Sequence, residues 1–429
     1  MKPLDTNADP RVVGPFELLA RLGAGGMGVA YLAREIPLDG LSDEMVAAYR
    51  LVEPDRDRGR DEAADPSRLV VVKMIQPNLL DQSQARERFA REIDAVRAVV
   101  SDRVPALRAA DPEAGEPWFA MDYIAGPSLH TMVKESGPLP VGPCAALGLA
   151  LVDALAAIHG TRLLHRDLKP SNVVLGPDGP VVLDFGLAAV AERQSSQALT
   201  RTGDRLGTCR YMPVEQLRDT KRVEAPADVY ALGATLFFAL TGRAPYPYMP
   251  LTVPPMWEGV DPAFQPLLGR VIVAEPLRRP GLDGVRESLS ALLAEAGLPP
   301  EQAAAQLRER VAAAGLTPVL PPEALVGRAD PVVRELAQKA VDEGEAPDAP
   351  WAEGDPGFYG VVTVEEIEWA GGWADSHSGH PLTLLDDGTG WTPTAPTIPL
   401  PASEHRVDAG PAVGHPFLPP RTGKAPTVR

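Results

Sequence analysis

The sequence predicts an α+β protein with two lobes: a β-rich first lobe with one main helix, then a mainly helical second lobe and a largely irregular C-terminal extension. Short apolar runs rich in β-branched residues, such as 70–75, predict strands in the first part of the chain. Longer apolar runs at about 142–160 and 226–242 predict helices in the second part. From residue 345 onward Pro, Gly, Thr and Asp are abundant, which is typical of an extended linker.

The first lobe is expected to follow a disordered leader at 1–12. In chain order, its pattern predicts a strand, a glycine-rich loop and a second strand within 13–33, a strand at 70–75, a helix at 83–99 and a strand at 118–124. The helix is predicted because Phe89, Ile93 and Val96 fall on one face at helical spacing. The long, acidic stretch 35–68 lies between two of the strands, and we interpret it as an insertion.

The chain is expected to divide into one two-lobed domain, a helical segment and a tail. The two-lobed domain is expected at 13–297, with its first lobe at about 13–120 and its second at about 125–297. Helical periodicity continues through 298–344. The tail, 345–429, is rich in Pro and Gly and is expected to be mostly disordered. Disordered tails are usually poor in aromatic residues, so part of this tail is alternatively docked on a surface through Trp351, Trp369, Trp373 and Trp391.

Charge and cysteine content exclude several classes of protein. The formal net charge of −17 argues against binding to nucleic acid or to an anionic membrane surface. The two cysteines, Cys144 and Cys209, are too few for a disulfide framework and favour a cytoplasmic location. The most apolar runs, 144–158 and 229–240, are shorter than the roughly 18 residues that a membrane-spanning helix needs. We therefore expect no membrane span.

Two neighbouring motifs in the second lobe contain the residue types that phosphoryl transfer requires. The first is LHRDLKPSN at 164–172, and DFG follows at 184–186. Phosphoryl transfer needs a carboxylate near the attacking hydroxyl, a cation on the moving phosphoryl group and oxygen ligands for magnesium. The two motifs supply all three kinds of group within a short stretch of chain.

A glycine-rich motif in the first lobe is compatible with nucleotide binding. Gly23, Gly25 and Gly28 form G-x-G-x-x-G. This signal is weak alone, because Rossmann folds use it before a helix and a plain hairpin turn can also contain it. Residues 29–32 are better explained as a strand, so we expect the glycines to bring backbone amides close to phosphates.

Together these motifs resemble the protein-kinase superfamily, and in particular the bacterial eukaryotic-like (Hanks-type) serine/threonine kinases, in a form without a transmembrane span. The resemblance covers about residues 13–297 and implies a bilobal kinase fold that uses ATP and Mg²⁺. It implies that Asp167 is the catalytic base and that Lys169 contacts the γ-phosphate. Asn172 and Asp184 would be the Mg²⁺ ligands.

The resemblance also assigns the ATP pocket. Lys73 would contact the α- and β-phosphates and form an ion pair with Glu92, although Glu92 is alternatively an ordinary helix-surface residue. The residues expected around adenine are Ala30, Val71, the gatekeeper Met121 and the hinge residues Asp122 to Ile124. The family usually has Val at the position of Ala30 and Ala at that of Val71, so we interpret the two differences as a compensated, volume-conserving swap.

Regulatory and structural residues follow from the same resemblance. Arg166 would bind a phosphorylated residue of the activation segment, 184–215, with Thr200 and Thr202 as candidate autophosphorylation sites, although this loop is alternatively only solvated. Further residues match family positions: Thr208 would tether the segment to the catalytic aspartate, Asp228 would anchor the catalytic loop, and Glu215 would pair with Arg279.

One segment departs from the family and leaves other readings open. The run CRYMPVE at 209–215 replaces the common PGYMAPE, and this puts peptide specificity in doubt. There are two alternatives. One is a pseudokinase that acts as an ATP-binding scaffold through its tail, and the other is a small-molecule phosphotransferase. The leading prediction is a serine/threonine protein kinase with protein substrates and a homodimer as a candidate state for trans-autophosphorylation.

Overall fold

The computed structural model describes residues 1–25, 28–36, 69–76, 79–80, 83–185, 209–219, 222–247, 254–326 and 329–342. Nearly all of the predicted insertion at 35–68, the candidate phosphosites Thr200 and Thr202, the tether Thr208 and the tail at 345–429 lie outside the described residues.

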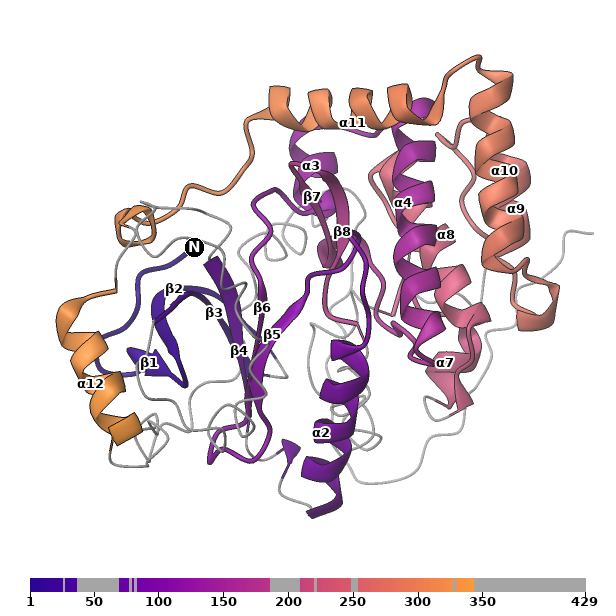
Figure 1. Ribbon diagram of the computed structural model, residues 1–429. Coiled ribbons are helices and arrows are strands. Elements are labelled where there is room, and N and C mark those ends of the chain that lie inside the picture. The colour runs from indigo at the N-terminus through magenta and orange to yellow at the C-terminus, as the bar shows by residue number, and fades with distance from the viewer. Residues whose placement is uncertain are drawn as a thin grey trace, which may run out of the picture. The chain divides into compact units, whose positions relative to one another are not determined.

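The first lobe is built on one antiparallel sheet (Figure 1). Within the described part of the chain, six strands pair in the order β1 (Val12–Val13), β2 (Phe16–Gly25), β3 (Gly28–Glu35), β4 (Leu69–Ile75), β6 (Trp118–Asp122) and β5 (Leu107–Asp111). The predicted strands are therefore present. The sequence analysis did not predict β5, whose short run contains Arg108 and two alanines.

Alternation along β3 and β4 divides the sheet into two faces. Tyr31, Val72 and Met74 are buried in one apolar cluster with Trp118. Lys73, which lies between Val72 and Met74 and points to the other face, is only half-buried. The helix α2 (Ser83–Arg97) packs on the lobe as predicted, with Phe89, Ile93 and Val96 buried, and Phe89 lies 6.4 Å from Phe119 between ring centroids.

The second lobe is mainly helical (Figure 1). Its helices are α3 (Leu129–Ser136), α4 (Val141–Gly160), α7 (Val214–Arg218), α8 (Pro226–Thr241), α9 (Gln265–Val271) and α10 (Leu282–Glu295). A hairpin of β7 (Val173–Gly176) and β8 (Gly179–Val182) and the short 3-10 turns η3 (Pro170–Asn172) and η5 (Pro276–Arg278) complete it. Because α4 and α8 are apolar nearly all round, they form the centre of this lobe.

The helix α4 corrects one expectation from the sequence. Its 20 residues are long and apolar enough to cross a membrane by length and composition, with a mean hydropathy of 2.0. The sequence analysis placed this run below the necessary length, because it counted only residues 144–158. In the structure 72% of the apolar window is buried, and α4 contacts α8, α10 and α11 (Pro300–Ala314), which is the environment of a core helix.

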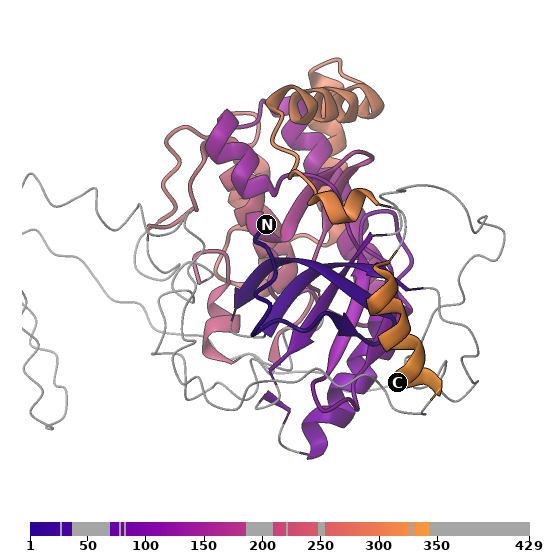
Figure 2. The same cartoon turned by 90° about the vertical axis from the view of Figure 1, so that its left-hand side faces the viewer.

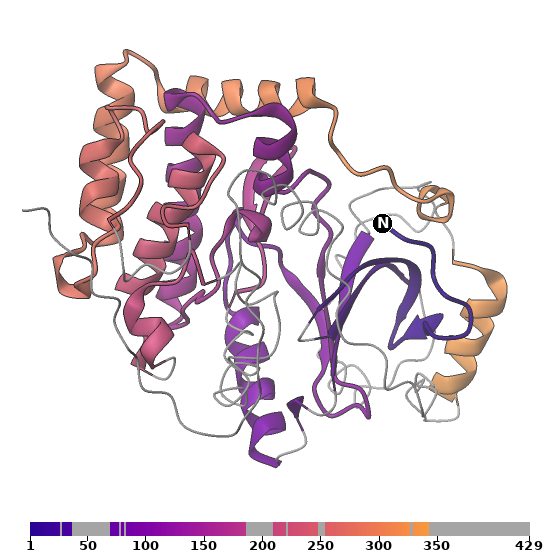
Figure 3. The ribbon, with the colours of Figure 1, turned by 180° about the vertical axis from the view of Figure 1, so that it is seen from behind.

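The residues after 297, where the sequence predicts helical segments through 344, pack against the folded domain. Helix α11 lies against α4, and its Leu307 and Val311 join the main apolar core. The chain then reaches the sheet lobe, where the turn η6 (Pro322–Leu325) buries Ala324 and α12 (Pro331–Asp342) buries Val333. Figures 2 and 3 both show α12 beside the strands of the first lobe.

The N-terminal residues are also ordered, so the expectation of a disordered leader is wrong for them. Lys2 pairs with Arg21 of β2 through two backbone hydrogen bonds of 2.9 Å each. Leu4 packs against the apolar cluster of the sheet, and Asp9 is buried. Polar composition favoured disorder, but the segment gains its order from contacts to residues far along the chain.

Candidate active site

The catalytic loop is held by one buried carboxylate, that of Asp228 in α8. This residue is 1% exposed and accepts hydrogen bonds of 2.9 Å from the backbone amides of His165 and Arg166, while Nε2 of His159 lies 2.8 Å from its Oδ2. Burial disfavours the charged form, but these hydrogen bonds outweigh it and lower the pKa of Asp228. Because Arg166 has a positive φ of 65°, this loop needs such support.

Asp167 lies at the centre of the site with its two carboxylate oxygens in different environments. Oδ2 accepts a 3.1 Å hydrogen bond from Nδ2 of Asn172 and lies 3.2 Å from Nζ of Lys169. Nδ2 of Asn172 also donates to the backbone oxygen of Asp167 at 2.8 Å. Oδ1 is buried, and no donor in the described part of the chain reaches it. One acceptor oxygen therefore remains available for a group that enters the site.

Lys73 and Asp184 form the second charged pair of the site, although they come from different lobes. Their Nζ and Oδ1 atoms are 2.7 Å apart. The protein around Asp184 disfavours its charged form, but the charge of Lys73 outweighs this and lowers the pKa of Asp184. Asp184 has a positive φ of 59°. Among the described residues, Lys73 forms its ion pair with Asp184. The resemblance implied an ion pair between Lys73 and Glu92 instead.

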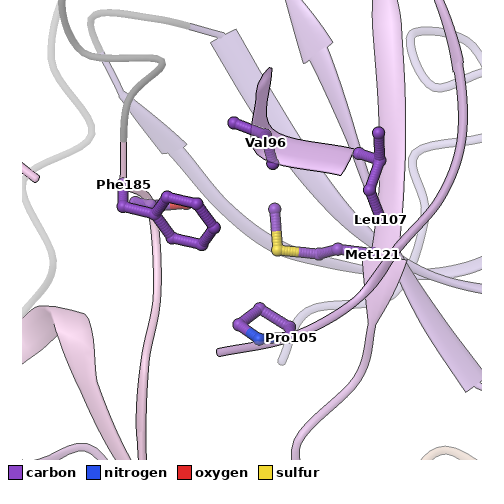
Figure 4. A pocket seen from close by; sticks show the side chains of 6 residues that line it. Val96, Pro105, Leu107, Met121 and Phe185 are labelled. Carbon is purple, nitrogen blue, oxygen red and sulfur yellow. The ribbon is translucent and has the colours of Figure 1, made fainter. Parts of the chain in front are cut away.

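An apolar contact behind this pair joins the two lobes. Phe185 points toward Met121, and Val96 of α2 and Leu107 of β5 lie around them (Figure 4). The space left between them is about 10 Å³, which is close to the minimum that one water molecule needs. The gatekeeper Met121 is only 8% exposed, so this apolar wall closes the inner end of the site.

The hinge connects β6 to the second lobe and presents one free backbone donor. The amide of Asp122 donates to the Ala106 oxygen at 3.1 Å, and the amide of Tyr123 donates to the Leu69 oxygen at 3.0 Å. The half-buried amide of Ile124 donates to no acceptor in the described part of the chain. It is therefore the hinge amide that an adenine ring can use.

The glycine-rich strands leave open space where a ligand can approach. A Cβ atom at Gly23 or Gly25 would meet nothing within 4 Å. A Cβ atom at Gly28 would lie 1.8 Å from the Met74 oxygen, and Gly28 has a φ of 146°. Packing within the protein thus explains glycine at position 28. The first two glycines are not required by packing, and they fit a role in ligand approach.

The donor set also fits magnesium. No group of three or more His, Cys, Asp or Glu residues within the described ranges is arranged to hold a metal ion by itself. Magnesium is usually bound by one or two protein oxygens together with substrate phosphates. The side chains of Asn172 and Asp184 can supply such oxygens. A 2.8 Å hydrogen bond from the backbone amide of Leu183 to the backbone oxygen of Asn172 holds their two segments together.

The family-like pair of Glu215 and Arg279 is present. The guanidinium of Arg279 binds both carboxylate oxygens of Glu215, at 2.5 and 3.1 Å. Gln216 was not singled out from the sequence, yet its buried amide donates to the Arg166 oxygen at 2.5 Å. The Gln216 contact connects the end of the activation segment to the catalytic loop, and only the three-dimensional structure reveals it.

The altered adenine-pocket positions, Ala30 and Val71, lie on one face of neighbouring strands. Ala30 is opposite Lys73, and Val71 is opposite both Leu32 and Met121. Ala30 and Val71 are therefore diagonal neighbours across β3 and β4, and both are half-buried. This placement is compatible with a compensated change of volume.

Restoring Val at position 30 alone is expected to raise the KM for ATP about fivefold, since overpacking typically costs about 1 kcal/mol or more. The double variant Ala30→Val with Val71→Ala is expected to return to within about twofold of the natural KM, because the summed side-chain volume is restored. Steady-state kinetics of the single and double variants would measure this. Equal KM values for the two variants would refute the compensation.

Comparison with known proteins places the chain in a family. Residues 62–281 match the family described as the protein kinase domain. The chain belongs to the protein kinase family. The match begins inside the predicted insertion, whereas β1 to β3 precede it and belong to the same sheet.

The relatives with which the chain aligns are bacterial kinases. It is 39% identical over 271 residues to the serine/threonine-protein kinase AfsK of Streptomyces griseus, which covers 61% of this chain and 30% of AfsK. It is 31% identical to PkaA, a serine/threonine-protein kinase of Streptomyces coelicolor, over 75% of this chain and 62% of PkaA. The chain thus spans about three tenths of AfsK.

A solved structure confirms the fold class. The kinase domain of Mycobacterium tuberculosis PknI superposes with a TM-score of 0.50 and 23% identity, over 68% of this chain and 99% of that domain. Together, these matches confirm the predicted α+β bilobal fold and the membership of the chain in the protein kinase family.

Proposed function

We propose that the protein is an ATP-dependent serine/threonine protein kinase that transfers the γ-phosphate of ATP to hydroxyl groups of protein substrates. The observation that carries this proposal is the asymmetry of Asp167. Its Oδ2 is engaged by Lys169 and Asn172, whereas its buried Oδ1 has no donor within the described residues. A buried acceptor without a donor is unfavourable unless a ligand supplies one, and a substrate hydroxyl is such a donor.

The proposed reaction is a direct transfer. The substrate hydroxyl donates its hydrogen bond to Asp167, and this carboxylate takes the proton as the hydroxyl oxygen forms its bond to the γ-phosphorus. The bond from that phosphorus to the bridging oxygen breaks, and ADP leaves with the electron pair. Lys169 lies 3.2 Å from Asp167 and would offset the negative charge of the phosphoryl group. Bound Mg²⁺, held by Asn172 and Asp184, would neutralise charge on the phosphates.

Regulation by autophosphorylation is part of the proposal. Nε of Arg166 is buried and has no hydrogen-bond partner in the described part of the chain, so a phosphate could supply one. Thr200 and Thr202 are the proposed acceptors, and a transient homodimer would allow transfer in trans. We further propose a cytoplasmic location, which the low cysteine content and the acidic net charge support.

The test is a transfer assay followed by phosphosite mapping. Purified protein is incubated with Mg-ATP, alone and with a generic protein substrate, and Asp184→Ala serves as the control that lacks one proposed metal ligand. We expect phosphate on Thr200 or Thr202, and we expect its loss in the control and after removal of metal with EDTA. Measurable ATP binding without any transfer would contradict the proposal and would favour the scaffold alternative.

A further inference from the structure

An ionic cluster connects the N-terminal segment to the glycine-rich strands. The carboxylate of Asp9 accepts a 2.7 Å hydrogen bond from the hydroxyl of Tyr31 in β3 and also pairs with the guanidinium of Arg21 in β2. The amide of Asp5 donates to the other carboxylate oxygen at 2.8 Å. The side chain of Asp9 is 1% exposed, so the cluster is built into the lobe.

The cluster is charged despite its burial. Burial disfavours the ionised form of Asp9, but the amide of Asp5, the hydroxyl of Tyr31 and the guanidinium of Arg21 outweigh it, so the pKa of Asp9 lies below its ordinary value. Burial and the neighbouring Asp9 raise the pKa of the Tyr31 hydroxyl, which therefore remains a donor at neutral pH. The guanidinium of Arg21 also lies over the Tyr31 ring, 6.0 Å from its centroid.

The position of the cluster along the strands gives it a function. Arg21 and Tyr31 face each other in the ladder of β2 and β3, and the register shifts immediately afterwards, between Arg21 and Gly23. Beyond this irregularity lie the pair of Gly23 with Ala30 and the rest of the glycine-rich motif. A bulge redirects the strands that follow it. The last regular pair before the bulge therefore determines where the glycine-rich loop begins.

We propose that Asp9 is a positioning residue of the nucleotide site: by holding Arg21 and Tyr31 together, it fixes the two strands from which the glycine-rich loop extends and so strengthens binding of the ATP phosphates. This inference rests on the proposed function, because it assumes that the loop binds ATP. It adds a contribution from a segment that precedes the first strand. The effect acts through the loop backbone and does not require Asp9 to touch the nucleotide.

A matched control for Asp9 exists at the other end of the same strand pair. Glu17 of β2 and Arg34 of β3 are cross-strand partners and form a buried ion pair of 2.6 Å, with side chains 5% and 10% exposed. Glu17→Gln removes a buried carboxylate from this pair, as Asp9→Asn does from the cluster. The Asp9 cluster lies next to the register shift that leads into the glycine-rich motif, whereas the Glu17 pair lies near the other shift, between Leu18 and Ala20. The two variants therefore separate an effect on the loop from a general loss of stability.

The experiment compares binding of ATP and adenosine to the full-length protein. Adenosine shares the base and ribose of ATP but lacks the phosphates, so the ratio of the two affinities reports the phosphate contribution. We expect Asp9→Asn to weaken ATP binding about tenfold, to leave adenosine binding within about twofold and to raise the KM for ATP with little change in kcat. Glu17→Gln is expected to lower stability without changing the ratio.

The outcomes distinguish the possible failures. The positioning role would be overturned if Asp9→Asn weakened the binding of ATP and of adenosine equally. It would also be overturned if Glu17→Gln changed the ratio of the two affinities as much as Asp9→Asn does. If Asp9→Asn does not fold, Tyr31→Phe removes only the hydroxyl, keeps the ring in its buried position and should lower the ratio about threefold. If the protein without substitutions binds adenosine and ATP equally well, the proposed function is overturned as well.

Discussion

Replacing Asp167 with Asn is expected to lower kcat for phosphoryl transfer about 10²- to 10⁴-fold, the contribution usual for a positioned general base. The amide has nearly the same size and can still contact Lys169 and Asn172 through its oxygen, so the loop should keep its geometry. The proton of the substrate hydroxyl loses its acceptor. Because Asp167 does not belong to the adenine pocket or the glycine-rich strands, the affinity for ATP should change by less than about threefold.

Kinetics with saturating ATP and a protein substrate, together with direct measurement of ATP binding, would test this. Asp153→Asn is a suitable control, because Asp153 is 47% exposed on α4 and pairs with Arg286 on the surface. This control should retain full turnover. If kcat for Asp167→Asn stays within tenfold of the natural value, the base is another residue.

Ending the chain at residue 297 instead of 342 is expected to lower the free energy of unfolding by several kcal/mol. Residues 298–342 include six side chains that are 9% exposed or less: Ala303, Leu307, Val311, Ala324, Val333 and Ala337. Loss of one buried leucine side chain costs about 2–5 kcal/mol, and a whole domain is stable by only about 5–15 kcal/mol. Urea denaturation of the fragments 1–342 and 1–297 would measure the difference, and equal midpoints would contradict it.

Point variants of the full chain separate packing from truncation. Leu307 of α11 is 2% exposed, whereas Leu336 of α12 is 56% exposed. Leu307→Ala is expected to destabilise the protein by about 2–5 kcal/mol, and Leu336→Ala by about 0.5 kcal/mol or less. If both substitutions lower the free energy of unfolding by the same amount, the packing of α11 on the second lobe is not the source of the stability.

The sequence was sufficient where the signal is local or a motif is long. The strand that ends near Lys73 and the helix that carries Phe89, Ile93 and Val96 were predicted from periodicity, and the structure contains both. The contact between Glu215 and Arg279, 64 residues apart, came only from a family pattern and not from any local property of the sequence.

Elsewhere the decisive contacts are long-range. The buried Asp9 is 22 residues from Tyr31, and polar residues near a terminus give no local sign that they will be buried. Periodicity predicted the helices after 297 but not the surfaces that receive them. Lys73 lies 2.7 Å from Asp184, and the choice between Asp184 and Glu92 as its partner depends on how the two lobes and α2 are arranged, which no local pattern records.

The return of the chain to the first lobe has a mechanical consequence. The backbone passes from the sheet lobe to the helical lobe at the hinge, and it returns between Gly315 and η6, where Leu320 packs against the same apolar cluster as Tyr123 of that hinge. The guanidinium of Arg34 binds the backbone oxygens of Glu323 and Val326 and secures this return. A body attached to another at two places turns most easily about the line through both. While η6 and α12 remain docked, opening of the nucleotide site is therefore restricted mainly to one axis.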